Sequence, residues 1–195
     1  MNYIPILKNV SKHISLDHDE ISFFTSLLDY MEIKKKKHLI RQGEVARFTH
    51  YIIKGCLRVY NTDEKGFVHI SAFAIEDYWI SDLYSFLTQT PATMHLDALE
   101  DTEIFQISKN NLEKLYQEVP KFERFFRIMH QNAYIALNQR IMKNISSPAE
   151  EQYRQFLEKY PNLELRIPQK QIAAYLGITP EFLSMMKRKL ARRKD

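Results

Sequence analysis

The sequence predicts an α+β fold, with an N-terminal β-roll or jelly roll, one long helix and a C-terminal all-α domain. Three observations predict this order. Residues 33 to 108 have the sequence pattern of about eight short strands with few connecting helices. Residues 120 to about 145 form an uninterrupted helical run, and residues 167 to 193 read as two helices around one glycine.

The first segment, up to about residue 30, reads as helical. Its apolar residues recur at three- and four-residue spacing, as on one face of a helix. They are Ile21, Phe24, Leu27, Leu28 and Met31. Asp17 or Asp19 is a suitable N-cap for this helix.

The strand region is recognised by alternation and by its glycines. The stretch "HYIIKGCLRVYNTDEKGFVHISAFA" is rich in β-branched and aromatic residues, and Gly43, Gly55 and Gly66 punctuate it and the residues before it. We expect "TDEKGF" to be a hairpin turn between two strands. The stretch "MHLDALEDTEIFQIS" predicts two further strands, separated at Glu100 and Asp101.

Helices resume at residue 109, with Ser108 as the expected cap and Pro120 in the first turn of the long helix. A helix of more than 20 residues with an apolar stripe needs a partner, which is either the β-roll or the same helix of a second chain. The stripe consists of Phe122, Phe125, Phe126, Met129, Ala133, Ala136, Leu137 and Ile141. The stretch "SSPAE" then ends this helix, and Ser147 is expected to cap the next one. "LELRI" reads as a short strand.

Composition limits the function. The chain has 28 Lys and Arg against 24 Asp and Glu, a net charge of +4, and six of the basic residues lie in the last nine positions. Charge concentrated in this way indicates an anionic partner, most simply nucleic acid, although a solvated basic tail is the alternative. The single cysteine, Cys56, and the absence of a leader-like start predict a reducing cytoplasmic location, and no apolar run has membrane-spanning length.

The stretch "QKQIAAYLGITPEFLSMMKRKL" has the pattern of a helix-turn-helix. Gly177 permits the positive φ of the turn, Thr179 is a good N-cap, and Pro180 suits the first helical position. Small Ala173 stands where the helices must cross. The inner faces are formed by Ile172, Ala173 and Leu176 in the first helix, and by Leu183, Met186 and Leu190 in the second. An ordinary pair of antiparallel helices is the alternative.

The outer face of the second helix predicts DNA contacts, because such a helix enters the major groove. The residues expected at base edges are Thr179, Glu181, Ser184, Met185 and Arg188. The residues expected at phosphates are Lys187, Lys189, Arg192 and Arg193. A helix-turn-helix that serves protein contacts in a ligand-binding signalling module is the alternative function.

Taken together, the chain resembles the Crp/Fnr family of bacterial transcription regulators. The resemblance rests on "AIEDYWISDLYSFL", "PATMHLDALEDTEIFQIS", "VPKFERFFRIMHQNAYIAL" and "QKQIAAYLGITPEFLS". It implies a cyclic-nucleotide-binding-like domain at residues 1–118, a dimerisation helix at 119–146 and a DNA-binding domain at 147–195. The implied partners are a second copy of the chain and palindromic double-stranded DNA. RNA polymerase and an unknown small-molecule effector are further candidates.

The chain departs from the family at its effector segment, for which we take Trp79, Ser81, Asp82, Ala92 and Thr93 as candidates. Cyclic-nucleotide binders of the family carry Gly-Glu and Arg-Ser or Arg-Thr where this chain has Ser81-Asp82 and Ala92-Thr93. Without the arginine, a buried phosphate would be poorly compensated, so we expect neither cAMP nor cGMP as ligand.

Other features bear on cofactors and catalysis, and haem held by one of the scattered histidines stays an open alternative. One cysteine cannot supply an iron–sulfur cluster, and the seven histidines form no ligand-spaced pair. A cupin-type metalloenzyme would need a His-x-His motif, which is absent, so we predict no enzyme activity, metal or cofactor. Met185 replaces the arginine usual in the family. A β-hairpin wing is expected to be absent or supplied by "LELRI". The run of lysines at residues 34 to 37 is either a phosphate contact or a solvated sheet edge.

Overall fold

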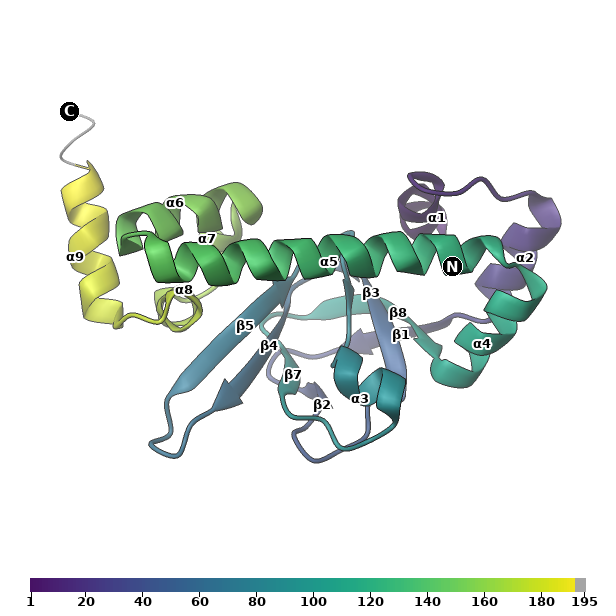
Figure 1. The fold of residues 1–195 in the computed structure, drawn as a ribbon, viewed down its shortest axis with the longest axis horizontal. Helices are drawn as coiled ribbons and strands as arrows, with labels where there is room; N and C mark the ends of the chain where they lie inside the picture. Colours follow the sequence, from purple (N-terminus) through teal and green to yellow (C-terminus); the bar gives the residue numbers. More distant parts are fainter. Residues whose placement is uncertain (192–195) are drawn as a thin grey trace.

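The computed structural model describes residues 1–191, and Figure 1 shows that one long helix organises them. A β-roll lies on one side of this helix. The first helices gather near its N-terminal end, and a separate group of helices gathers at its C-terminal end. The predicted α+β architecture is confirmed.

The β-roll is built from two four-stranded sheets, and every pairing within them is antiparallel. One sheet has the order β1-β8-β3-β6 and the other β2-β7-β4-β5. The strands in the described residues are β1 (Asp29–Ile33), β2 (His38–Ile40), β3 (Phe48–Lys54), β4 (Leu57–Thr62), β5 (Val68–Ala74), β6 (Trp79–Ile80), β7 (His95–Ala98) and β8 (Thr102–Ser108). Buried side chains of both sheets, such as Ile52 and Leu96, belong to one hydrophobic cluster, as expected for a sandwich.

The predicted hairpin turn joins β4 to β5. Asp63 holds it together, because its Oδ1 accepts hydrogen bonds from the backbone N–H groups of Lys65 and Phe67, both at 2.9 Å. Gly66 supplies the positive φ, +84°, that the turn requires.

The N-terminal prediction was only partly right. The structure has two helices, α1 (Ile4–Ser11) and α2 (His18–Ser26), and the chain then enters β1 at Asp29. Asp17 is the N-cap of α2 and forms a capping box with Glu20. The helix does not reach residue 30, because Asp29 and the residues after it pair with β8.

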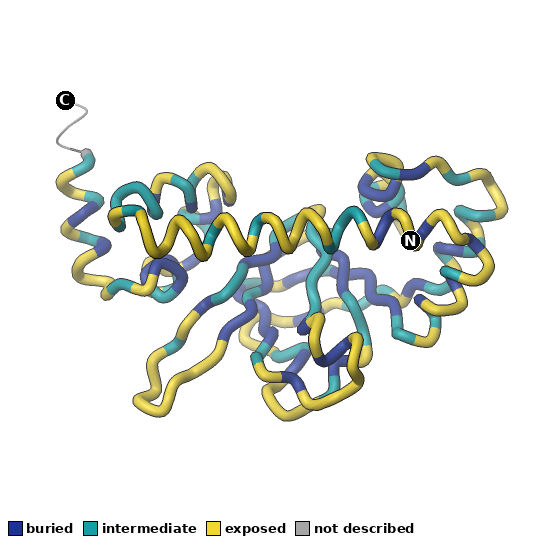
Figure 2. The backbone as a smooth tube through the Cα atoms, in the orientation of Figure 1, coloured by how far each residue is buried: buried dark blue, intermediate teal, exposed yellow. Residues whose placement is uncertain are grey.

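Two helices follow the β-roll: α4 (Lys109–Glu118) and α5 (Lys121–Ser146). Ser108 caps α4 as predicted, its Oγ accepting from the N–H of Asn111 at 3.1 Å. The first turns of α5 are buried: Phe122, Phe125 and Phe126 pack into the core of the chain itself. Beyond them the helix is largely exposed, which Figure 2 shows as a mostly yellow tube with teal stretches. The predicted stripe therefore has two parts with different surroundings.

The C-terminal group comprises α6 (Ala149–Lys159), α7 (Leu163–Arg166), α8 (Gln169–Leu176) and α9 (Pro180–Ala191). Two predictions here were wrong. The N-cap of α6 is Pro148, with no side-chain hydrogen bond, so Ser147 does not cap it. "LELRI" is not a strand: Leu163 and Ile167 are buried on one side while Leu165 is 83% exposed, which is a helical period. It therefore supplies no wing.

The turn between β3 and β4 depends on Gly55, whose φ is +108°. A Cβ at this position would lie 2.7 Å from the Cα of Thr102. Thr102 cannot easily move, because its Oγ1 accepts from the N–H of Cys56 at 3.2 Å and donates to the carbonyl of Glu100 at 2.8 Å. We expect Gly55→Ala to lower the free energy of unfolding by about 3 kcal/mol or more, measured by urea denaturation.

A matched control separates the clash from the backbone strain. Gly66 also has positive φ, but nothing lies within 4 Å of a Cβ built there. Gly66→Ala should therefore cost only the left-handed strain, about 1 kcal/mol. Equal losses for the two variants would contradict the clash.

Candidate nucleic-acid interface and effector segment

Helices α8 and α9 form the predicted helix-turn-helix. Gly177 ends α8 in the left-handed conformation, with φ +68°, and the N–H of Ile178 bonds to the carbonyl of Ala173 at 3.1 Å. Thr179 begins the next helix: its Oγ1 accepts from the N–H of Phe182 at 3.2 Å. Each predicted turn residue thus has its expected role.

The inner faces of the two helices close a small core. Leu183 is fully buried and Met186 is 3% exposed, both within the same cluster as Ile172 and Ala173. This core orients α9, so that the side opposite Leu183 and Met186 faces solvent.

The outer face of α9 holds the predicted base-reading residues. Thr179, Glu181, Met185 and Arg188 are exposed, and Ser184 is half-buried. Apolar and charged side chains therefore share one exposed surface. Sequence reasoning missed Phe182, which is 44% exposed beside them and had no assigned role.

The expected phosphate contacts have different surroundings. Lys189 is exposed and lies 3.3 Å from Glu150 Oε1. The Nζ of Lys187 donates to Glu164 Oε2 at 2.9 Å, so this lysine is engaged within the domain. Arg192 and Arg193 lie outside the described residues.

The C-terminal helices are docked on the β-roll through aromatic rings. Phe73 of β5 lies 5.7 Å from Tyr160 and 5.3 Å from Tyr175, measured between ring centroids. The same cluster includes Phe156, 5.6 Å from Tyr160. Burial raises the pKa of Tyr160 well above its usual value, so its hydroxyl stays protonated. No sequence pattern indicates this contact between distant segments.

Arg140 ties three elements together at the same place. From α5, its guanidinium donates to the carbonyl oxygens of Ser71 and Ile70 in β5, the latter at 3.0 Å. It also donates to the carbonyl of Tyr175 in α8 at 3.0 Å and stacks 3.9 Å above the ring of that tyrosine. This half-buried fork of donors therefore helps to hold α8 in its orientation relative to the β-roll.

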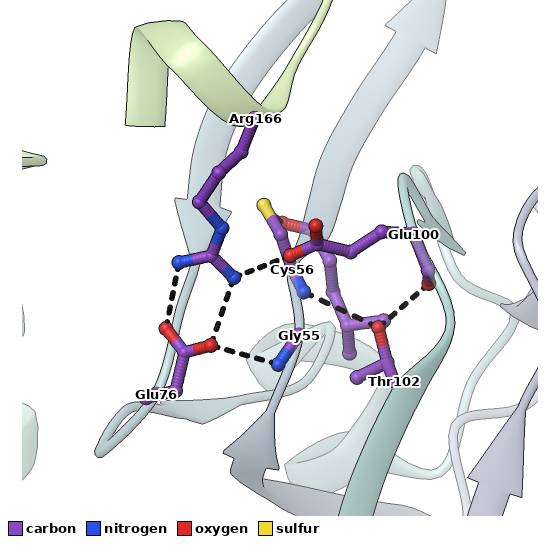
Figure 3. Close-up of polar contacts among 7 residues, drawn as sticks. Gly55, Cys56, Glu76, Glu100, Thr102 and Arg166 are labelled. Carbon is purple, nitrogen blue, oxygen red and sulfur yellow. Dashed lines mark hydrogen bonds and ion pairs between the residues drawn. The ribbon is translucent and has the colours of Figure 1, made fainter. Parts of the chain in front are cut away.

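Arg166, at the end of α7, forms a second clamp, drawn in Figure 3. Its two terminal nitrogens donate to the carboxylate of Glu76 at 2.8 and 2.9 Å, and one of them also bonds to Glu100. Glu76 in turn accepts from the N–H of Gly55 at 2.9 Å. Partial burial raises the pKa of Glu76, but the bonds from Arg166 outweigh it and the pKa is lowered overall.

Removing this clamp has a predictable cost. We expect Arg166→Met to lower the free energy of unfolding by about 1 kcal/mol at neutral pH, a modest value because Glu76 is 41% exposed. Because the pKa of Glu76 is lowered in the folded state, its contribution is complete above the ordinary value of 4.5 and is lost as the pH falls through the lowered one.

Urea denaturation of the wild type and the variant at pH 7 and pH 3 measures this difference. Lys34→Met is the matched control, because Lys34 pairs with Asp101 at 2.9 Å with side chains that are 69% and 63% exposed. The control should cost little at either pH. An Arg166 effect that does not shrink at low pH would contradict the clamp.

In the candidate effector segment, hydrogen bonds within the chain occupy the carboxylate of Asp82. Asp82 is the N-cap of the short helix α3 (Leu83–Thr88), and its Oδ1 accepts from the N–H of Ser85 at 3.0 Å. Its Oδ2 accepts from the N–H of Thr93 at 3.2 Å. This hydrogen bond brings Asp82 and Thr93 together. Ala92, next to Thr93 in the sequence, is buried, and Ser81 Oγ donates to the carbonyl of Phe48 at 2.9 Å.

Trp79, the fifth candidate, faces elsewhere. Its indole N–H donates to Asn9 Oδ1 in α1 at 3.1 Å, and its ring packs against Phe125 and Phe126 of α5. It therefore joins the β-roll to helices α1 and α5. It does not approach Asp82 in any contact that we observe.

Comparisons with known proteins agree with this architecture. Residues 30–119 match the cyclic nucleotide-binding domain family. FixK2 from Bradyrhizobium japonicum is 18% identical over 86% of each chain, with a TM-score of 0.76. CLP from Xanthomonas campestris, a c-di-GMP-responsive global regulator, is 14% identical over 91% of this chain and 93% of its own, with a TM-score of 0.73.

A putative regulator of the Crp/Fnr family from Eubacterium rectale is 16% identical over 99% of this chain and 89% of its own, with a TM-score of 0.70. No curated protein matches in a sequence comparison. The match to the cyclic nucleotide-binding domain family is therefore limited to residues 30–119, and the whole chain has the fold of the solved Crp/Fnr-type regulators. The predicted resemblance is confirmed at this level. In the described residues, no helix is long and apolar enough to cross a membrane.

Proposed function

We propose that this protein is a dimeric, sequence-specific DNA-binding transcription regulator with an effector other than cAMP. The observation that carries the proposal is the outer face of α9. That face exposes Glu181, Met185 and Arg188 on a helix held by a closed hydrophobic core. The second helix of a helix-turn-helix reads the major groove from such a surface.

The chemistry of this face suits base edges. Arg188 can donate two hydrogen bonds to guanine, and Glu181 can accept one from the amino group of cytosine. Met185 is 55% exposed and offers an apolar contact to a thymine methyl group. Lys189 would contact a phosphate in exchange for its ion pair with Glu150.

Dimerisation is proposed from the exposed second half of α5. Apolar side chains line this part of the helix at intervals of three, four and seven residues, which is the spacing of a helix–helix seam. They are Tyr134, Leu137, Ile141 and Ile145, with Met142 beside them, and each of the five is at least 48% exposed in the single chain. A second copy of the same helix would cover them and give the two-fold symmetry that a palindromic site requires.

The decisive experiment selects binding sites from random double-stranded DNA with the purified protein. Recovery of a palindrome, with affinity that falls steeply with salt, would support the regulator. Suppose that no motif is recovered and that binding is weak even at low salt. That result would favour the alternative function, in which the exposed Phe182 and Met185 contact another protein.

The effector prediction follows from Asp82. A cyclic nucleotide phosphate bound at this segment would meet a carboxylate that already holds the N–H groups of Ser85 and Thr93. Calorimetric titration with cAMP and with cGMP should therefore show no saturable heat up to about millimolar nucleotide, a weak-affinity limit of about −4 kcal/mol. Micromolar saturable binding that is lost in Thr93→Ala would contradict this.

A further inference from the structure

A cleft of about 330 Å³ lies between the C-terminal part of α5 and helices α6 and α8, and no residue of the β-roll lines it. Figure 1 shows α6 and α8 beside this end of α5. Two lining residues, Gln139 and Lys143, lie on the side of α5 opposite Ile141, so the proposed dimer seam is on the other side of the helix. The volume is at the lower end of the range for small-molecule sites.

Three cations line this cleft, but only one carboxylate does. The cations are Arg140, Lys143 and Lys159, and the carboxylate is Glu158. Among residues 1–191, none of these four side chains takes part in an ion pair.

The lack of a carboxylate partner sets Arg140 apart. Arg58 and Arg166 are the other half-buried arginines of residues 1–191, and both are bonded to carboxylates. The hydrogen bonds of Arg140 go only to backbone carbonyl oxygens, which are uncharged acceptors. Its positive charge is therefore not neutralised within the described part of the chain.

A second cation is held close to this charge. Partial burial lowers the pKa of Lys159, and Arg140 lowers it further. The two side chains rest on neighbouring rings: Arg140 stacks 3.9 Å above Tyr175, and Lys159 Nζ lies 5.2 Å from the centroid of Tyr160. The centroids of these two rings are 5.9 Å apart. Like charges held together in this way are unfavourable unless an anion lies near them.

Neutral donors and an apolar floor complete the cleft. The side chains of Gln139 and Asn144 are exposed lining residues, and neither amide group makes a hydrogen bond within residues 1–191. The amide of Gln152 is already used, because it donates to the carbonyl oxygens of Asn144 and Ser147 at 3.3 and 2.9 Å. Phe156 lines the cleft and is 1% exposed. Cations and amide donors above an apolar floor suit an anion that carries a small organic body.

We propose that this cleft binds the phosphate group of a small metabolite. The ammonium groups of Lys143 and Lys159 contact the phosphate oxygens, and Arg140 adds its charge from beside them. The lining has a net charge of +2, which matches a phosphate monoester with its charge of about −1.5 to −2 at pH 7 better than a single carboxylate. Lys143 belongs to α5 and Lys159 to α6, so the bound phosphate joins these two helices. The site does not rest on the proposed function.

The test uses glycerol 3-phosphate as the probe and carbon NMR of the lysine side chains as the readout. We expect saturable shifts at Lys143 and Lys159 with a dissociation constant of about a millimolar or below. Lys114, an exposed lysine of α4, should change little. Glycerol with potassium chloride at the same ionic strength is the control and should give no saturable shift. If the shifts at Lys143 and Lys159 do not saturate, or only match those of Lys114, the proposal is overturned.

Variants locate the site. Lys143→Gln and Lys159→Gln should each weaken the probe about tenfold, whereas Lys114→Gln should not. All three changes replace exposed lysines, so the fold is retained. Wild-type affinity in both cleft variants would also overturn the proposal.

A DNA backbone offers the same phosphate chemistry, and a separate readout distinguishes the two sources. If the cleft takes a metabolite, Lys159→Gln should leave the salt dependence of binding to random DNA unchanged. A slope reduced by about 1, together with unchanged probe affinity, would assign the cleft to the DNA backbone and overturn the proposal. A wild type that binds the probe but binds no DNA would contradict the proposed function and leave the site standing.

Discussion

Ile141→Asp is expected to convert the proposed dimer into a monomer and to weaken binding to a palindromic site by about a hundredfold or more. Ile141 is 48% exposed in the single chain and lies at the centre of the apolar seam on α5. In a dimer it would be buried opposite its own copy, so two carboxylates would face each other without compensation. A monomer binds only one half-site, so it loses the affinity that a dimer gains by binding both half-sites at once.

Sedimentation velocity at tens of micromolar protein measures the assembly, and fluorescence anisotropy on a palindromic site measures the affinity. Asn132→Asp is the matched control, because this exposed residue lies on the opposite side of the same helix from Ile141. It should change neither. A wild-type monomer at these concentrations would refute the seam.

The choice of residue depends on the structure. Phe126, which the sequence places on the same stripe, is 3% exposed and packs against Trp79 and Phe125. An aspartate there would destabilise the single chain, and a loss of dimer would then say nothing about the seam. The sequence predicts the stripe but not the point at which it passes from the core to the surface. That point depends on how far α5 is covered by contacts such as those of Phe24 with Phe122 and of Trp79 with Phe126.

Local patterns predicted the fold well where the physical cause was local. Alternation predicts the strands because one face of each is buried, and the roles of Gly177 and Thr179 follow from backbone geometry at single residues. The N-terminal prediction failed where two causes compete. The residues after Ser26 keep a helical spacing of apolar side chains, but pairing with β8 makes them a strand.

The contacts that orient the C-terminal helices could not be predicted. Arg166 bonds to Glu76 across 90 positions, and Arg58 to Gln171 across 113. No spacing rule relates such distant residues, and each of these side chains alone looks like an ordinary polar or charged surface residue. The hydrogen bonds that Asp82 accepts within the chain could not be predicted for the same reason. The sequence shows an acid where the family has one, but its bond to the N–H of Thr93 appears only in three dimensions.

The second large effect concerns α9, where Arg188→Ala and Lys189→Ala are expected to behave differently. Arg188 lies on the outer face with Glu181 and Met185, away from buried Leu183. Loss of a bidentate contact to guanine costs about 1–3 kcal/mol per half-site at one base pair only. Arg188→Ala should therefore abolish the preference at that position and leave binding to random DNA nearly unchanged.

Lys189→Ala should instead weaken all sequences alike and reduce the slope of log affinity against log salt by about 1 for each half-site. Met185→Arg should add a guanine preference at a neighbouring position, because it restores a donor fork on the exposed side of the helix. Binding to a set of single-base site variants at two salt concentrations measures all three variants. The base-reading role of α9 would be refuted by a uniform loss in Arg188→Ala that matches Lys189→Ala. In that event both residues would act only as charges, and specificity would have to come from another part of the protein or from the shape of the DNA.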